Sequence, residues 1–147
     1  MLTRYFDASA LVKRYVREPG AVTVRRLLKA DAGAASRLSE VEVASALVRR
    51  AREGAFTVGE RDRALASLAD DVAALIIVEF TPEISAAARA LLLRHRLRAG
   101  DAVQLASCLY LQREMGQQLP LVAFDDRLLE AAHHEGLTVV PPWKGIR

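Results

Sequence analysis

The sequence predicts an α/β protein with a central, mainly parallel sheet that helices cover on both faces. Short β-prone runs alternate with longer helical patterns along the 147 residues, as expected of parallel strands joined by helices. Two of these runs, near opposite ends of the chain, stop at an aspartate that directly precedes a helical pattern. No internal repeat, linker or low-complexity tail breaks this order, so we expect residues 1–147 to form one domain.

Five runs have strand character, although their compositions differ. The run at 75–80 is rich in β-branched residues, whereas the run at 33–35 consists of small residues. Pro141 and Pro142 close the last run, because proline cannot donate to a strand ladder. The predicted strands cover residues 2–6, 33–35, 75–80, 121–124 and 137–140.

Seven segments show helical patterns, several of them with recognisable ends. Pro82 stands at an early helical position, where its missing N–H costs little, and Gly54 ends another helix. Gly100 separates two further helices. The predicted helices cover residues 9–15, 21–29, 39–52, 58–74, 82–94, 101–115 and 127–134.

The composition is that of a globular protein, with 52% hydrophobic and 27% charged residues. No apolar run approaches the ~20 residues that span a bilayer, and the N-terminus lacks a signal-peptide pattern. We therefore expect a cytoplasmic protein that does not associate with membranes. The formal net charge of +3 permits a polyanionic partner without requiring one.

Four acids stand out by their positions: Asp7, Glu42, Asp101 and Asp125. Taken singly, each has a structural explanation. The three aspartates stand at or near predicted helix starts, where a carboxylate caps free N–H groups. Glu42 follows Ser39 at the spacing of a capping box.

Taken together, the four acids predict a composite site. Asp7 and Asp125 follow two different strands, so both lie at one edge of the sheet if those strands are parallel. Gly100 gives a ligand room to approach Asp101. Carboxylates that cluster raise one another's pKa and destabilise the fold unless a cation offsets them. One or two Mg²⁺ ions, which prefer oxygen ligands, meet that need.

Four motifs in order make the chain resemble PIN-domain proteins of the VapC family, the toxins of type II toxin–antitoxin pairs. The resemblance covers essentially the whole chain. The motifs are Tyr5–Lys13 with Glu18-Pro19-Gly20, Ser39–Leu47 around Glu42, Leu97–Ala106 around Asp101, and Phe124–Leu128 with Asp125.

The resemblance implies a three-layer α/β/α sandwich and a Mg²⁺- or Mn²⁺-dependent endoribonuclease. Asp7, Glu42, Asp101 and Asp125 would be catalytic and hold the metal, whose bound water would attack an RNA phosphate. Ser9 would orient Asp7 or contact a phosphate. The implied partners are an RNA substrate, a second copy of the chain, and a cognate antitoxin. That antitoxin is expected to be a small DNA-binding protein whose C-terminal segment covers the acidic site.

The chain departs from the family pattern near its fourth acid. Ala123 stands where relatives often have Thr or Ser, so a supporting hydroxyl is either missing or supplied elsewhere, for instance by Ser9. A second acid, Asp126, follows directly and is a candidate supporting residue of the site. The spacing of Asp125 to Arg127-Leu128 selects Asp125 as the fourth acid. Glu40, a rival of Glu42, lies ~200° away around the helix.

Five basic residues flank the acids in sequence, and they would hold the RNA backbone if they line the site. The alternative is a solvated basic face. The five residues are Lys13, Arg14, Arg17, Arg96 and Arg98. His133 and His134 are adjacent on a helix and point apart, which favours a solvated helix end, and Trp143 is predicted to anchor the tail by packing.

Three alternatives are weighed against the ribonuclease. A catalytically weak PIN-fold module that only binds RNA or an antitoxin would have no use for clustered negative charge. A phospho-acceptor domain needs an acidic pair after the first strand, where Asp7 stands alone. A phosphatase of the Asp-x-Asp type would need an acid in place of Ser9.

Overall fold

The computed structural model describes residues 2–30 and 32–145, and its strands form one parallel sheet in the order β3-β2-β1-β4-β5. Strand β1 is central, with Tyr5 paired to Ala34 of β2 on one side and to Leu121 of β4 on the other. The strands are β1 Thr3–Phe6, β2 Ala32–Ser36, β3 Ile76–Val78, β4 Leu121–Val122 and β5 Val139–Val140. The predicted parallel sheet is confirmed.

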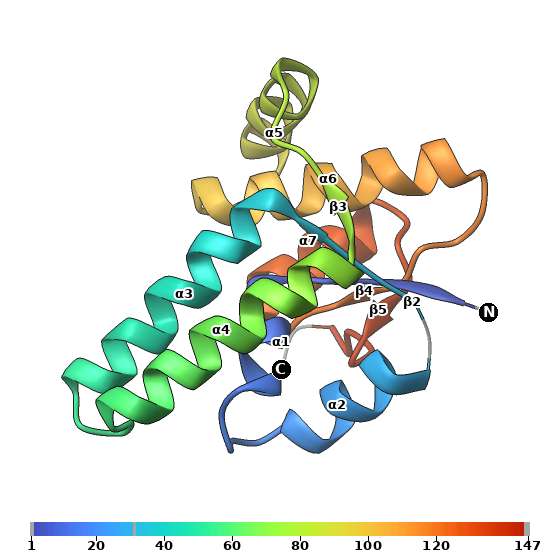
Figure 1. Cartoon of the computed structure of the whole chain (residues 1–147). Coiled ribbons are helices and arrows are strands. Elements are labelled where there is room, and N and C mark those ends of the chain that lie inside the picture. Colours follow the sequence, from blue (N-terminus) through green and yellow to red (C-terminus); the bar gives the residue numbers. More distant parts are fainter. Residues whose placement is uncertain (1, 31, 146–147) are drawn as a thin grey trace.

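The helices lie on both faces of this sheet, as predicted (Figure 1). They are α1 Ala8–Leu11, the 3₁₀ turn η1 Val12–Arg14, α2 Ala21–Ala30, α3 Arg37–Arg52, α4 Val58–Ala74, α5 Pro82–Arg94, α6 Ala99–Met115 and α7 Asp126–His134. In Figure 1, α3 and α4 run side by side and extend away from the sheet. None of the described helices is long and apolar enough to cross a membrane.

The side chains of each strand point alternately to the two faces of the sheet, and they contribute to two separate hydrophobic cores. Tyr5 of β1 packs with α5, α6 and α7, whereas its neighbour Phe6 packs with α1, α2, α3 and α4. Leu121 and Val122 of β4 divide between the two cores in the same way. Successive side chains of a strand point to opposite faces, so two adjacent apolar residues serve both helical layers.

Four predicted helix starts, at residues 9, 39, 101 and 127, lie one or two residues after the observed starts, and Gly100 lies inside α6 instead of before it. Helix α3 begins at Arg37, two residues before the predicted start, because Ser36 caps it by accepting a hydrogen bond from the Leu38 N–H at 3.0 Å. The predicted capping box of Ser39 and Glu42 is therefore wrong, and Glu42 lies within the helix. The predicted helix at 9–15 is the short α1 followed by η1.

The carboxyl ends of β1, β2 and β4 lie at one edge of the sheet, and α1, α3 and α7 begin within a few residues of them. The backbone N–H of Asp7 donates to the Val122 carbonyl at 3.0 Å, which holds the first acid beside the end of β4. This edge is where the fold gathers the predicted acids.

Candidate active site

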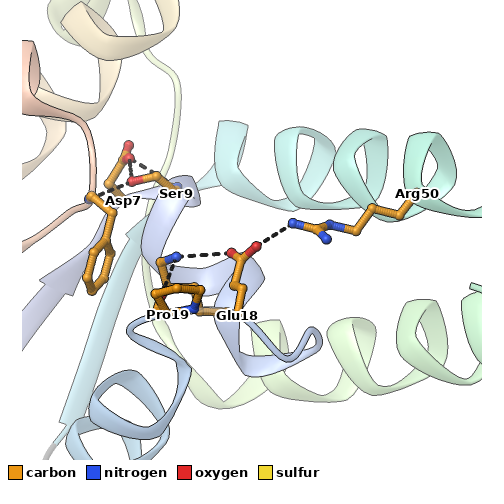
Figure 2. Close-up of polar contacts among 7 residues, drawn as sticks. Asp7, Ser9, Glu18, Pro19 and Arg50 are labelled. Carbon is orange, nitrogen blue, oxygen red and sulfur yellow. Dashed lines mark hydrogen bonds and ion pairs between the residues drawn. The ribbon is translucent and has the colours of Figure 1, made fainter. Parts of the chain in front are cut away.

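Asp7 is the most deeply placed of the four acids. Its side chain caps α1, and the residue is 4% exposed. Ser9 donates to the same oxygen, Oδ2, from its backbone N–H at 3.1 Å and from its hydroxyl at 2.6 Å, and Figure 2 shows the two side chains facing each other. Burial raises the pKa of Asp7 to about 6, against these hydrogen bonds and with help from the charges of Glu42 and Asp101.

Ser9 also binds the loop that follows β4. Its Oγ accepts a hydrogen bond from the Phe124 backbone N–H at 3.0 Å while donating to Asp7. Ala123 lacks the hydroxyl that relatives often carry at its position before the fourth acid. The Ser9 hydroxyl, from α1, supports the same loop instead. Ser9 orients the first acid and fixes the loop of the fourth.

Glu42 is half-buried and is held by α6. The side-chain amide of Gln104 donates to Glu42 Oε1 at 3.0 Å and to Ser39 Oγ at 2.8 Å. The Tyr5 hydroxyl, at the core end of this chain of contacts, donates to Gln104 Oε1 at 2.6 Å. Every polar group of Gln104 therefore helps to position the carboxylate.

Gly100 lies against the other carboxylate oxygen of Glu42. A Cβ at this position would stand 3.4 Å from Oε2, so the glycine leaves open the space between the carboxylate and the first turn of α6. Gly100 and Gln104 are four residues apart and lie on one helical face. Helix α6 thus binds one oxygen of an acid that belongs to α3 and leaves space beside the other.

Asp101 and Asp125 complete the edge. Burial raises the pKa of Asp101, the charges of Asp125 and Glu42 raise it further, and a backbone hydrogen bond at Arg98 opposes the shift. Asp125 caps α7 by accepting from the Leu128 N–H at 3.0 Å. Asp126 is exposed and lies beside the C-terminal segment around Trp143, so Asp125 is the acid that influences Asp101.

The structure therefore joins the two explanations of these acids. Asp7 and Asp125 do cap helices, and Asp101 lies in a first helical turn, yet all of them and Glu42 are coupled electrostatically at one edge. The helix starts explain part of how negative charge is tolerated there. The raised pKa values of Asp7 and Asp101 show that this compensation is incomplete.

The donor set is made entirely of carboxylates, which suits a hard cation. Among the residues that the structure describes, no three acidic, histidine or cysteine side chains are close enough to share one ion. Mg²⁺ is commonly held by one or two carboxylates, with waters and substrate phosphates completing its shell. The residues present therefore fit a Mg²⁺ ion that takes one or two carboxylates from the protein and its remaining ligands from water and substrate.

Lys13 does not have the surface position predicted for a phosphate contact. It is 8% exposed, its ammonium donates to Glu18 Oε1 at 3.0 Å and to the Pro19 carbonyl at 2.8 Å, and it stands 4.6 Å from the centre of the Phe124 ring. Glu18 in turn binds Arg50 from the last turn of α3 (Figure 2). These partners engage the Lys13 ammonium inside the protein, so this structure gives the predicted RNA contact of Lys13 no support.

The turn that carries Glu18 fits tightly against Phe124. Gly20 has φ of +92°, a conformation that favours glycine, and a Cβ there would stand 2.7 Å from the Phe124 ring. Gly20 and Lys13, which belong to the first sequence motif, thus pack against Phe124 in the loop after β4. We call Lys13, Glu18 and Arg50 the ion-paired cluster.

The other predicted basic residues differ in their contacts. Arg14 pairs with Asp71 of α4 through two hydrogen bonds of 2.6 and 3.2 Å, and the Tyr15 hydroxyl donates to the same carboxylate. Arg17, Arg96 and Arg98 are exposed. The charge of Arg98 lowers the pKa of Asp101, which places this arginine near the acidic edge.

The residues set aside in the sequence occupy structural positions. Trp143 packs beside His133 and His134, with ring centres 5.0 and 5.2 Å away, so its predicted packing role is confirmed. Glu40 pairs with Arg37 at 3.0 Å, on a different side of α3 from Glu42. Sequence reasoning missed Tyr5 and Gln104, although the position of Gln104 one turn after Gly100 was a usable signal.

Comparison with known proteins agrees with this geometry. The family model of the PIN domain matches residues 4–134. Ribonuclease VapC45 of Mycobacterium tuberculosis is 38% identical over 139 residues, which are 93% of this chain and 94% of that protein. The crystal structure of Mycobacterium tuberculosis VapC20, a Sarcin-Ricin loop cleaving toxin, superposes with a TM-score of 0.67 at 20% identity, covering 91% of this chain and 95% of that one.

A toxin–antitoxin complex from Klebsiella pneumoniae superposes with a TM-score of 0.58 at 20% identity, covering 84% of this chain and 88% of that chain. At such identities the two solved structures establish the fold, whereas the family model and the curated relative establish the family. The chain belongs to the PIN-domain family, among the VapC ribonucleases.

Proposed function

We propose that this protein is a Mg²⁺- or Mn²⁺-dependent endoribonuclease and the toxin of a toxin–antitoxin pair. The observation that carries the proposal is the deep burial of Asp7 among other carboxylates, with a pKa raised to about 6. A buried acid that its own protein leaves undercompensated is a strong candidate for a cation ligand.

In this proposal each acid has a distinct part. Asp7, held on Oδ2 by Ser9, would bind the ion directly, and Asp101 and Asp125 would contribute through waters bound to it, since no three of these acids are close enough to share one ion. Glu42 would take its place as a ligand or as a partner of a bound water, because Gln104 fixes its orientation. A bound ion would supply an activated water and stabilise charge on the phosphate.

The partners proposed are an RNA substrate, a second copy of the chain and a cognate antitoxin. The solved toxin–antitoxin complex with this fold supports the antitoxin. We propose that the antitoxin is a small DNA-binding protein whose C-terminal segment covers the acidic edge. A cationic or arginine-bearing segment would satisfy the carboxylates there in place of a metal ion.

The proposal is tested by incubating the purified protein with total bacterial RNA in Mg²⁺, in Mn²⁺ or in chelator, and mapping the new RNA ends. We expect defined cleavage only with metal. Asp7→Asn should lower the cleavage rate by about a hundredfold or more, because it removes a charged ligand from the reacting site.

Matched controls come from the same helices. Glu42→Gln should impair cleavage whereas Glu40→Gln, on the other side of α3, should not, and Asp125→Asn should exceed Asp126→Asn in effect. Cleavage that survives Asp7→Asn would contradict the assignment of Asp7. Tight RNA or antitoxin binding without cleavage under any metal condition would instead support the non-catalytic binding module.

A further inference from the structure

A second feature lies beside the acidic edge, between α7 and the segment that joins α5 to α6. It is a hollow of about 330 Å³, whose polar lining is mostly cationic or titratable. The polar side chains that line it are Arg94, His95, Arg96, Arg127, Glu130 and His134.

One end of this hollow is closed by internal pairing. Glu135 accepts hydrogen bonds from Arg94 at 3.1 and 3.3 Å and shares a contact of 2.6 Å with His95 Nε2. Arg94 and His95 are therefore both engaged with one carboxylate, which fixes the end of α5 against the end of α7. The hollow keeps its shape without any contribution from Arg96 or Arg127.

Arg96 and Arg127 face the hollow from its two walls. Both are exposed, and within residues 2–30 and 32–145 neither forms an ion pair. Glu130 is the one acid among the described residues that line the hollow, so the charge of Arg96 and Arg127 together exceeds it and the hollow remains positive. Two arginines on opposite walls, each with five N–H donors and no carboxylate partner, form a site for an anion.

Both walls of the hollow begin at the acidic edge. Arg96 lies two residues before Arg98, whose charge acts on Asp101, and Arg127 lies two residues after Asp125. Two residues span at most ~7 Å of chain. The hollow is therefore a neighbour of the proposed cleavage site, on the side of α7.

We propose that this hollow binds a backbone phosphate of the RNA strand next to the one that is cleaved. The inference rests on the proposed ribonuclease function. An acidic edge repels a polyanion, so the strand needs cations beside the metal to stay in place. Arg96 and Arg127 meet that need without a base contact, and the hollow thus sets the direction in which the strand leaves the site.

The test measures binding of a fluorescent single-stranded RNA to the Asp7→Asn protein, which is not expected to cleave it. Arg96→Gln with Arg127→Gln should weaken binding about tenfold at low salt. The slope of the logarithm of the binding constant against the logarithm of salt concentration should also decrease in magnitude by the contribution of roughly one to two phosphate contacts. The charge-matched control is Arg89→Gln with Arg113→Gln, two exposed arginines on α5 and on the far end of α6.

Three outcomes decide the inference. Loss of affinity in the first pair and none in the control supports it. Equal affinity and equal salt dependence in both pairs, with unchanged melting temperatures, would overturn it. Unchanged RNA binding together with weakened binding of a polyglutamate peptide would also overturn it, in favour of a protein partner.

Cleavage by the protein with native Asp7 is measured in parallel, so the two proposals fail separately. Suppose that the native protein cleaves RNA while the Arg96→Gln, Arg127→Gln variant binds RNA as tightly as the control variant. The phosphate site in the hollow is then refuted and the ribonuclease function stands. If the native protein cleaves nothing, the ribonuclease is refuted.

Discussion

Phe124 contacts both the acidic edge, through Ser9, and the ion-paired cluster, through Lys13, and the carboxylates of these two regions have opposite environments. At the acidic edge, burial and neighbouring acids raise the pKa values of Asp7 and Asp101. In the ion-paired cluster, burial works to raise the pKa of Glu18, but Lys13 and Arg50 outweigh it and lower that pKa. The chain supplies cations to one group and withholds them from the other.

This difference teaches where an external cation is needed. Glu18 has two cations of its own and requires nothing from solution, so its function is structural. Asp7 has a hydroxyl and a backbone N–H but no cationic partner among its hydrogen bonds. Phe124 links the groups, because its backbone N–H binds Ser9 while its ring lies under Lys13.

The largest effect is expected from removing the uncompensated charge of the acidic edge: without metal, Asp7→Asn should be more stable than the native protein. A carboxylate whose folded pKa is about 6 stabilises the fold while protonated and loses that contribution as the pH rises through this value. The full shift from an unfolded value near 4 corresponds to roughly 3 kcal/mol. In chelator at pH 7.5, urea unfolding should show Asp7→Asn to be the more stable protein.

The pH dependence provides the check on this prediction. At pH 4 the advantage of Asp7→Asn should largely vanish, because the native carboxyl is then mostly protonated. Asp70→Asn, at an exposed position of α4, should change the unfolding free energy little at either pH. A destabilised Asp7→Asn protein at pH 7.5 in chelator would show that the Asp7 charge is already compensated.

The acidic edge could be predicted from the sequence because its signals are local. A strand that stops at an aspartate before a helix places that aspartate at the carboxyl edge, whatever the rest of the chain does. Asp7 and Asp125 both follow this pattern. Glu42 was included by its position and by the resemblance, and the true start of α3 at Arg37 removes the capping box that offered it a purely structural explanation.

The supports of the site could not be predicted, because they join distant parts of the chain. Tyr5 and Gln104 are 99 positions apart, and Ser9 and Phe124 are 115 apart. Lys13 was misplaced for a related reason. Lys13 and Arg14 were grouped because both follow the first acid in sequence, and only the fold shows that Lys13 turns inward toward Glu18 while Arg14 pairs with Asp71.

A somewhat smaller effect is expected from adding the missing cation. Mg²⁺ at about a hundred times its dissociation constant should stabilise the protein by ~2.7 kcal/mol, since it binds the folded acids and not the unfolded chain. The gain should be read as a rise in melting temperature during Mg²⁺ titration. Asp7→Asn should lose most of this rise, whereas Glu18→Gln should keep it, because the ion-paired cluster is already neutralised from within.

The smallest of the three effects is expected from breaking the ion-paired cluster. Lys13→Met keeps an unbranched stem against Gly20 and Phe124 but removes the ammonium, leaving Glu18 with Arg50 alone. Removing one partner of a buried pair is strongly destabilising, and the remaining cation reduces the loss here to about 2 kcal/mol. Urea unfolding should show this loss.

Arg14→Met is the matched control for Lys13→Met, because it breaks the neighbouring, more exposed pair with Asp71 and should cost under ~1 kcal/mol. Adding Glu18→Gln to Lys13→Met should recover part of the lost stability, since the unpaired carboxylate is the source of the loss. If Lys13→Met and Arg14→Met were equally mild, Glu18 would not differ from the carboxylates of the acidic edge in the way that the pKa shifts indicate. The cations of the cluster would then be incidental to the support of the β4 loop, and the orientation of Asp7 would depend on Ser9 alone.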